Sequence, residues 1–356
     1  RMVGTGCRPS VTSPHLAGIG RSPQPVEDKP DDAGFLLAGR PATRSPDAVS
    51  RRVLLIRNPR SAAARDQKAR LEALVGRLAS DGSKIIEHHT TARGHATRLA
   101  AAHGGGCDIV LAAGGDGTVH EVASGLLDAG HERPLAVAPF GTGNDLARLL
   151  GTHDDDQLVA AMVARAPVAM DTITVRCRDV EGREVVRHAL LFAAVGFAGE
   201  LLRQTTPRVV RWFGPKLCYS VGFFRALFRY RPPMVTVRSG DRVERGPLFH
   251  VCAANAPHAA GGLMKLAPGA RLGDGRLELC LIRQSGPLEA AWQFPRLLRG
   301  THIHHPKVRC FQGTELAVDT DPPAPVAVDG ELVGFTPATF TVRPGSLRVF
   351  ARRSLG

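Results

Sequence analysis

The sequence has no long hydrophobic run. Its longest apolar stretch, Ala189 to Gly199, is far shorter than the roughly 20 residues that a helix needs to cross a bilayer. The arginines near the N-terminus are not followed by an apolar segment, so the pattern of a secretory signal peptide is absent. We therefore expect a cytoplasmic protein.

Cysteine motifs and aromatic side chains are also scarce. The seven cysteines are scattered with no CxxC pair, which favours small buried side chains in a reducing compartment over a disulfide framework. Aromatic residues make up only 5% of the chain, and no zinc-finger, RNP or basic-zipper pattern occurs. We therefore expect no nucleic-acid partner.

The balance of charge, by contrast, is strongly positive. The formal net charge of +13 favours anionic partners, which include nucleic acid, anionic lipid headgroups and phosphorylated substrates. The charge alone does not choose among them.

The chain of 356 residues suits two medium-sized domains. Residues 1–50 are rich in Pro, Arg, Ser and Gly without any periodicity, which predicts a disordered tail. Residues 51–168 alternate between short apolar runs and stretches with the 3.6-residue period of an amphipathic helix. This alternation predicts an α/β nucleotide-binding domain, in which a parallel sheet is covered by helices on both faces.

Residues 169–356 have a different pattern. Short β-like runs, such as Leu248–Ala253 and Leu277–Ile282, are separated by glycine and proline turns, which predicts an all-β, sandwich-like C-terminal domain. The exception is one helical stretch between Leu201 and Tyr230.

The first motif that indicates chemistry is the segment Gly114–Thr118, with the sequence GGDGT, between a predicted strand and a predicted helix. Gly114, Gly115 and Gly117 would let the backbone approach phosphate oxygens, and the helix N-terminus would favour the anion. Asp116 would repel a phosphate unless Mg²⁺ lay between them. The structural alternative is a tight turn with an aspartate cap.

A second segment of this kind follows the next predicted strand. It reads PFGTGND and covers Pro139 to Asp145, again at a strand-to-helix junction. Thr142 offers a hydroxyl to a phosphate, and Asn144 can cap its helix. We count both among the candidate nucleotide-binding residues. Two glycine loops at adjacent strand ends would form one anion-binding rim.

With these motifs the sequence resembles the family of diacylglycerol kinases, sphingosine kinases and bacterial lipid kinases, from about Arg52 to about Arg352. The elements that carry the resemblance occur in order: Asn58-Pro59, Thr90 before Gly94-His95-Ala96, Gly114–Thr118, Pro139–Asp145, Gly261-Gly262-Leu263-Met264 with Ala267-Pro268, Asp274-Gly275, and Asp329-Gly330-Glu331.

The resemblance implies an ATP-dependent kinase whose active site lies in the cleft between the two domains. Asn58, Thr90, Gly115–Thr118 and Thr142 would contact ATP, and Glu331 matches the proposed general base of the family. The resemblance also implies a structural Mg²⁺ held by the Asp274 side chain and the backbone carbonyl groups of Arg271 and Arg276. Asp329-Gly330 and Asp274-Gly275 are also typical of hairpin turns.

Residues 203–231 carry seven basic residues and no acidic one, interleaved with aromatic rings such as Trp212 and Phe213. This pattern suits peripheral contact with an anionic membrane surface. The alternative is a helix that packs its aromatic face on the sandwich and leaves the arginines in solvent.

These observations predict an ATP-Mg-dependent lipid kinase that phosphorylates a lipid hydroxyl, with diacylglycerol converted to phosphatidic acid as the preferred reaction. A kinase of a soluble substrate, similar to NAD kinases, is the first alternative. A catalytically silent member of the fold that only binds nucleotide or membrane is the second. The sequence leaves the acceptor lipid and the oligomeric state open.

Overall fold

The computed structural model describes residues 50–59, 64–164, 166–204 and 221–356. The predicted N-terminal tail, apart from residue 50, lies outside the described residues. So does the central part of the 203–231 segment, including Trp212 and Phe213.

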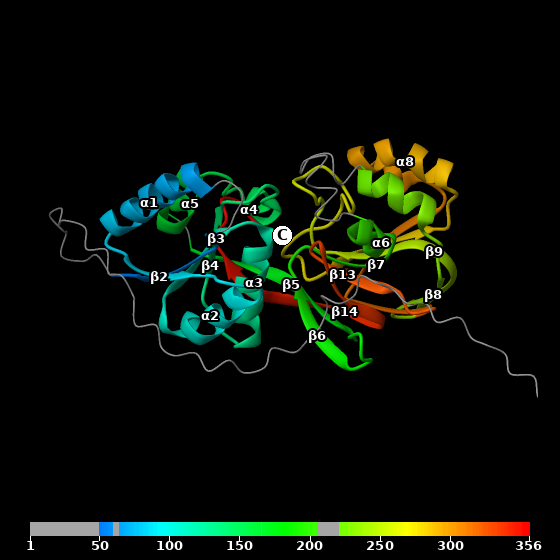
Figure 1. The fold of residues 1–356 in the computed structure, drawn as a ribbon, viewed down its shortest axis with the longest axis horizontal. Helices are drawn as coiled ribbons and strands as arrows, with labels where there is room; N and C mark the ends of the chain where they lie inside the picture. The colour runs from blue at the N-terminus through cyan, green and yellow to red at the C-terminus, as the bar shows by residue number, and fades with distance from the viewer. Residues whose placement is uncertain (1–49, 60–63, 165, 205–220) are drawn as a thin grey trace, which may run out of the picture.

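The first half of the described chain is a parallel sheet with helices on both faces (Figure 1). Its strands lie in the order β2, β1, β3, β4. The elements are β1 Arg52–Arg57, α1 Ala64–Ser80, β2 Lys84–His89, α2 His95–His103, η1 Gly104–Gly106, β3 Ile109–Gly114, α3 Asp116–Asp128, β4 Leu135–Pro139, α4 Asp145–Leu150 and α5 Asp155–Ala164.

Alternation along β1 explains the two layers of helices. Val53 and Leu55 belong to a buried cluster with α1 and α5, whereas Leu54 and Ile56 belong to a second cluster with α2 and α3. Successive strand residues point to opposite faces of a sheet, so an uninterrupted apolar run is what a sheet covered on both faces requires.

The second half is built mainly from antiparallel strands. Its elements are β5 Val168–Arg178, β6 Glu184–Ala189, β7 Phe192–Gly196, α6 Phe197–Gln204, β8 Met234–Ser239, β9 Arg242–Ala254, β10 Leu277–Arg283, α8 Pro287–Arg299, η2 Thr301–His304, β11 Val308–Gly313, β12 Glu315–Asp321, β13 Pro325–Val328 and β14 Glu331–Val349. Residues 221–229 are also helical. The apolar faces of β5, β7, β8, β10, β12 and β14 enclose one buried cluster with Phe340 among its members, as in a sandwich.

Strands β5 and β14 join the two halves (Figure 1). They pair antiparallel from Arg178 down to Val168, and the last residue of β14, Val349, pairs in parallel with Leu135 of β4. The fourteen strands of the described residues therefore form one continuous sheet. This shared ladder joins the sandwich to the α/β half.

The prediction of a single helical stretch in the second half was wrong. Besides α6 and residues 221–229, the chain forms α8, which begins with Pro287 and contains Pro295 in its interior. A proline in the middle of a helical pattern indicates a helix end, which is why sequence patterning missed this helix. Its first position tolerates Pro287 because the missing N–H would have no partner there.

Candidate active site

The two glycine loops lie against each other at adjacent strand ends. β3 pairs with β4 so that Gly114 is opposite Pro139, and each strand leads directly into its loop. A side-chain carbon added at Gly141 would lie 2.4 Å from the Cα of Gly115, so these backbones touch. The glycine at 141 is therefore required by loop-to-loop packing as well as by any ligand.

Asp116 links the loops electrostatically. Its two carboxylate oxygens accept hydrogen bonds from the backbone N–H groups of Asn144 (2.9 Å) and Asp145 (2.7 Å), at the start of α4. Burial raises the pKa of Asp116 and the nearby Asp145 carboxylate adds to the effect, while these N–H groups oppose it. The predicted aspartate cap is present, but it caps the neighbouring helix. Each oxygen still has a lone pair for a cation or its bound water.

Asn144 is the residue immediately before α4, at the N-cap position, but its side chain does not cap the helix. Its Oδ1 instead accepts the N–H of Gly141, and its Nδ2 donates to the carbonyl of the same residue, both at 2.8 Å. Its positive φ of 52° is tolerated by asparagine better than by most residues. The prediction of a side-chain helix cap was therefore wrong, because the amide is used to close the second glycine loop.

A cavity of about 410 Å³ opens beside the first loop. Five of the predicted nucleotide contacts line it: Asn58, Thr90, Gly115, Gly117 and Thr118. The other predicted contacts, Gly114, Asp116, Thr142 and Asn144, do not line it. Gly114 is packed against the Thr118 side chain, and Thr142 is exposed on the second loop.

The same cavity contains residues that sequence analysis did not select. Thr91, Ala92, Arg93, Ala96 and Glu121 complete its lining. The Glu121 carboxylate, on α3, accepts the N–H groups of Gly94 (2.8 Å) and Ala96 (3.2 Å) and so stabilises the N-terminus of α2. No sequence motif marks Glu121; only its position on the face of α3 that lines the cavity could have indicated this role.

The sandwich contributes Glu331 to this site. A side-chain carbon at Gly117 would lie 4.0 Å from its Oε1, and its Oε2 accepts a hydrogen bond from Arg93 at 2.6 Å. Glu331 follows the two-residue turn Asp329-Gly330, in which both residues have positive φ, as the type I′ hairpin turn requires. The structure therefore brings together a carboxylate and a glycine loop that are more than 200 residues apart.

Asp329 holds that hairpin in place. Its carboxylate accepts the backbone N–H groups of Leu190, Leu191 and Phe192 at 2.7–3.0 Å, and His120 of α3 lies 3.7 Å away. Burial raises the pKa of Asp329, against the lowering effect of His120 and the three N–H groups. Its position behind Glu331 makes Asp329 a structural anchor.

The sandwich also contacts the second loop. The N–H of Gly262 donates to the Asp145 carboxylate at 3.0 Å, and Gly261 lies against Gly143. The predicted motif Gly261–Met264 therefore meets α4 across the two halves of the protein.

The residues predicted to hold a structural metal lie in the loop before β10. Oδ1 of Asp274 accepts the N–H of Arg276 at 3.0 Å, and the N–H of Gly275 donates to the buried Asp171 carboxylate at 2.7 Å. The described residues contain no group of three or more His, Cys, Asp or Glu side chains arranged to hold a metal ion. A site here would depend on the Asp274 carboxylate and on backbone carbonyls.

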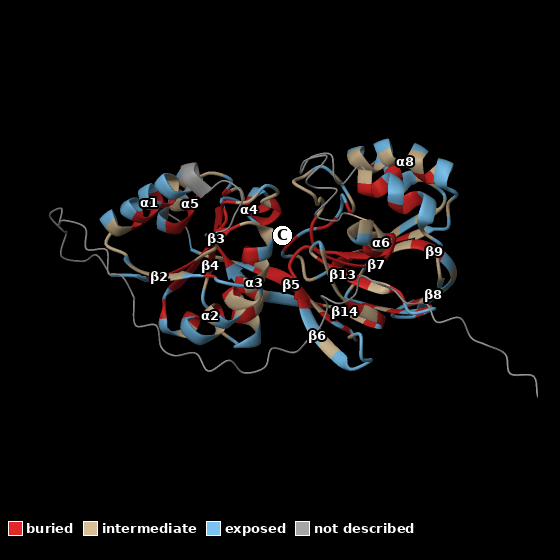
Figure 2. Ribbon diagram, viewed as in Figure 1, coloured by how far each residue is buried: buried red, intermediate tan, exposed pale blue. Residues whose placement is uncertain are grey.

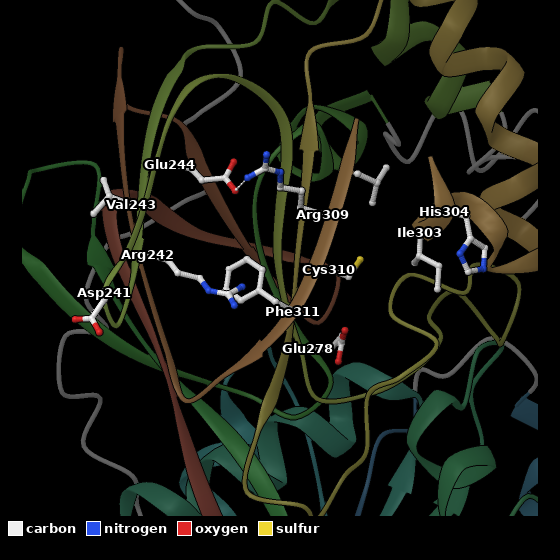
Figure 3. Close-up of a pocket in the computed structure, with 11 residues that line it drawn as sticks. Asp241, Arg242, Val243, Glu244, Glu278, Ile303, His304, Arg309, Cys310 and Phe311 are labelled. Atoms are coloured by element: carbon white, nitrogen blue, oxygen red, sulfur yellow. Dashed lines mark hydrogen bonds and ion pairs between the residues drawn. The ribbon is translucent and has the colours of Figure 1, made fainter. Parts of the chain in front are cut away.

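A second cavity, of about 850 Å³, lies on the sandwich between β9, β10, β11 and η2 (Figure 3). Three of its charged side chains are engaged with neighbours: Glu244 pairs with Arg309 at 2.8 Å, and the Arg242 guanidinium lies 4.7 Å from the centre of the Phe311 ring. None of its lining residues belongs to the predicted motifs, so the smaller cavity is the candidate active site.

An α/β domain with paired glycine loops, completed by a carboxylate from a β-sandwich, is the architecture of an enzyme that binds phosphate groups. Two family models match this chain: the diacylglycerol kinase catalytic domain at residues 52–175, and the YegS C-terminal NAD kinase beta sandwich-like domain at residues 200–351.

Curated relatives extend the match over both halves. The diacylglycerol kinase of Bacillus subtilis is 30% identical over 276 residues, which cover 77% of this chain and 88% of the relative. That of Staphylococcus aureus strain MRSA252 is 28% identical over 307 residues, which cover 85% and 93%. The chain belongs to the diacylglycerol kinase family, a family of lipid kinases.

Solved structures share the fold. A protein from Bacillus anthracis str. Sterne superposes with a TM-score of 0.71 at 22% identity, covering 88% of this chain and all of the other. A second, titled as a diacylglycerol kinase from the same organism, has a TM-score of 0.63 at 18% identity and covers 86% and 98%.

Proposed function

We propose that the protein transfers the γ-phosphoryl group of ATP, in the presence of Mg²⁺, to the free hydroxyl of diacylglycerol and so produces phosphatidic acid. The observation that supports this most is the approach of Glu331 to the Gly117 loop. The substrate is suggested by relatives that are named diacylglycerol kinases.

In this proposal the triphosphate lies over the first glycine loop. Gly115 and Gly117 leave room for phosphate oxygens, and the free N–H groups at the start of α3 donate to them. A Cβ at 117 would stand between the loop and Glu331. Asn58, Thr90 and Thr118 line the adjoining cavity and would bind the rest of the nucleotide.

Glu331 is the proposed general base. As the lipid oxygen bonds to the γ-phosphorus, the hydroxyl proton passes to Glu331 and the bond from the γ-phosphorus to the bridging oxygen breaks, which leaves ADP. Arg93 holds the carboxylate at the cavity edge and is itself within the lining, where its charge would also attract phosphate. Mg²⁺ bound with the triphosphate would neutralise charge on the phosphate oxygens.

Peripheral membrane contact through residues 203–231 is part of this proposal. Among the described residues, no helix is both long and apolar enough to cross a bilayer. The hydroxyl of diacylglycerol lies at the boundary between lipid and water, so the proposed reaction requires contact with a membrane surface, here at the cytoplasmic face.

The test is incubation with radiolabelled ATP and Mg²⁺ and a panel of acceptors, separated by thin-layer chromatography. The panel contains diacylglycerol, phosphatidylglycerol and a sphingoid base in anionic vesicles, with NAD as the soluble competitor. We expect labelled phosphatidic acid, and its loss in the Glu331→Gln variant. Label in NADP, or in no product, would refute the proposal.

A further inference from the structure

Exposed apolar side chains gather on two neighbouring helices that cover one end of the sandwich. In α8, Leu288 and Trp292 are 82% and 73% exposed, and in the helical residues 221–229, Phe224 and Phe228 are 44% and 63% exposed. Contiguous exposed apolar patches mark interaction surfaces, whereas single exposed apolar side chains are ordinary on protein surfaces.

The two helices form one surface. Phe294 of α8 lies 4.3 Å from Phe223 and 6.3 Å from Phe224, measured between ring centres. Phe223 is buried, and its cluster includes Ala290 of α8. Figure 1 shows α8 beside the green helix of residues 221–229, and Figure 2 shows pale blue outer faces on both.

Each helix has a second, buried apolar face, so core packing does not explain the exposed one. Ala226, Leu227 and Ala290 supply the buried side. Leu288 and Trp292 are four residues apart, as are Phe224 and Phe228, so each pair lies in one stripe on the outside of its helix.

The charge on this surface is positive. Five exposed arginines lie on the two helices or just after the first one: Arg225, Arg229, Arg231, Arg296 and Arg299. The only acidic side chain of α8, Glu289, is paired with Lys307 at 2.7 Å. Within the part of the chain that the structure describes, no ion pair joins any of these five arginines to an acidic side chain.

We propose that α8 and residues 221–229 together form a docking surface for an anionic lipid bilayer, in which Leu288 and Trp292 enter the interface and the arginines contact the headgroups. Tryptophan prefers this boundary because its ring is apolar and its N–H is polar. Arg296 and Arg299 follow Trp292 along the same stripe of the helix, so apolar and cationic side chains can contact the same membrane surface together.

This inference rests on the proposed function in one respect, since a lipid substrate requires a membrane-contacting surface. It adds α8, a helix outside the 203–231 segment, and names the side chains that enter the bilayer. The alternative occupant of this surface is a second copy of this chain. The five arginines favour the bilayer, because pairing two copies would bring like charges together.

The first test uses tryptophan fluorescence. The chain has two tryptophans, so a Trp212→Phe background makes Trp292 the only reporter. Vesicles of phosphatidylglycerol and phosphatidylcholine with brominated acyl chains should quench Trp292 and shift its emission to shorter wavelengths. Unchanged emission on bound protein would overturn the proposal.

The second test is co-sedimentation of Leu288→Ala/Trp292→Ala with the same vesicles. We expect at least about a tenfold weaker partition than for the parent, because two large apolar contacts are removed. The matched control is Val180→Ala/Val186→Ala, which truncates two exposed valines on the β5–β6 hairpin and should bind within twofold of the parent. Melting temperatures near that of the parent would show that both variants are folded.

Further variants separate the alternatives. Arg296→Gln and Arg299→Gln should each weaken partition about fivefold on phosphatidylglycerol vesicles, and not on neutral ones. If Leu288→Ala/Trp292→Ala binds vesicles as well as the parent does, the inference is overturned. It is also overturned if, without lipid, the parent is a dimer and this variant is a monomer, because the surface would then bind a second copy of the chain. Leu288→Ala/Trp292→Ala should keep its activity on diacylglycerol in neutral detergent micelles, where no bilayer has to be bound. If the parent binds as expected but phosphorylates no lipid, only the proposed function fails.

Discussion

Replacement of Glu331 by glutamine tests the proposed chemistry at one atom. Glutamine keeps the length and hydrogen-bonding capacity of the side chain but cannot accept the proton. The hairpin should hold its position, because Asp329 anchors it through three backbone N–H groups and is unchanged.

The expected magnitudes differ sharply between stability and rate. The Arg93–Glu331 pair is 71% and 42% exposed on its two side chains, so its loss should cost at most about 1 kcal/mol of folding free energy. Loss of a positioned base typically costs about 10² to 10⁴-fold in rate, equivalent to about 3–5 kcal/mol of barrier. kcat should therefore fall by at least about 100-fold, with little change in KM for ATP.

The assay combines urea unfolding with steady-state kinetics on diacylglycerol in mixed micelles. The matched control is Glu184→Gln, which breaks a second exposed pair, with Arg176 at 3.4 Å on the β5–β6 hairpin. It should leave kcat within twofold of the parent. A folded Glu331→Gln protein with kcat within a few-fold of the parent would show that another group removes the proton.

Three further outcomes follow from the packing of the site and the sandwich. Gly141→Ala should lose about 1–3 kcal/mol of stability and most activity, because its Cβ would overlap Gly115. The control Gly76→Ala has open space around it in α1 and should gain up to about 1 kcal/mol. Equal melting temperatures for the two variants would contradict the contact between the loops. Asp116→Asn should lower the free energy of unfolding in urea by about 1–3 kcal/mol and reduce turnover, because the amide N–H₂ of asparagine would face a backbone N–H of the second loop. A variant as stable as the parent would show that the carboxylate does not bridge the loops. Burial lowers the pKa of His250 to about 4, so as the pH falls the unfolded chain binds a proton at this residue before the folded protein does. The free energy of unfolding should therefore fall by up to about 3 kcal/mol as the pH drops from about 6.5 towards 4. If the stability of a His250→Asn variant, measured by urea unfolding, falls with pH as steeply as that of the parent, His250 is not the cause.

Local patterns predicted the alternation of strands and helices in the α/β half. Ile109–Gly114 and Leu135–Pro139 are strands within the predicted alternation, because a buried parallel strand is a short apolar run between polar turns. The helix over α5 was not predicted, and neither were β6, β7 and β11. In these segments the apolar spacing is irregular or the run is continuous, so periodicity does not separate helix from strand.

The site was only partly accessible from sequence. Glycine loops and the Asp329-Gly330 turn are recognisable because their backbone conformations restrict the residue type. The partners of Asp116 and the pairing of Arg93 with Glu331 have no local signature. They depend on contacts between segments 28 and 238 residues apart.

The sequence by itself determined the alternation of strands and helices in the first half, the glycine loops and the positive charge, since each follows from the conformational limits or charge of residues close together in the chain. Tertiary structure alone decided that Glu331 meets Gly117 and that Leu288 and Trp292 remain exposed. The physical reason is the β5–β14 ladder, which sets one half against the other, and the burial of α8 through Ala290 and Phe294, which consumes one face of that helix and leaves the other to solvent.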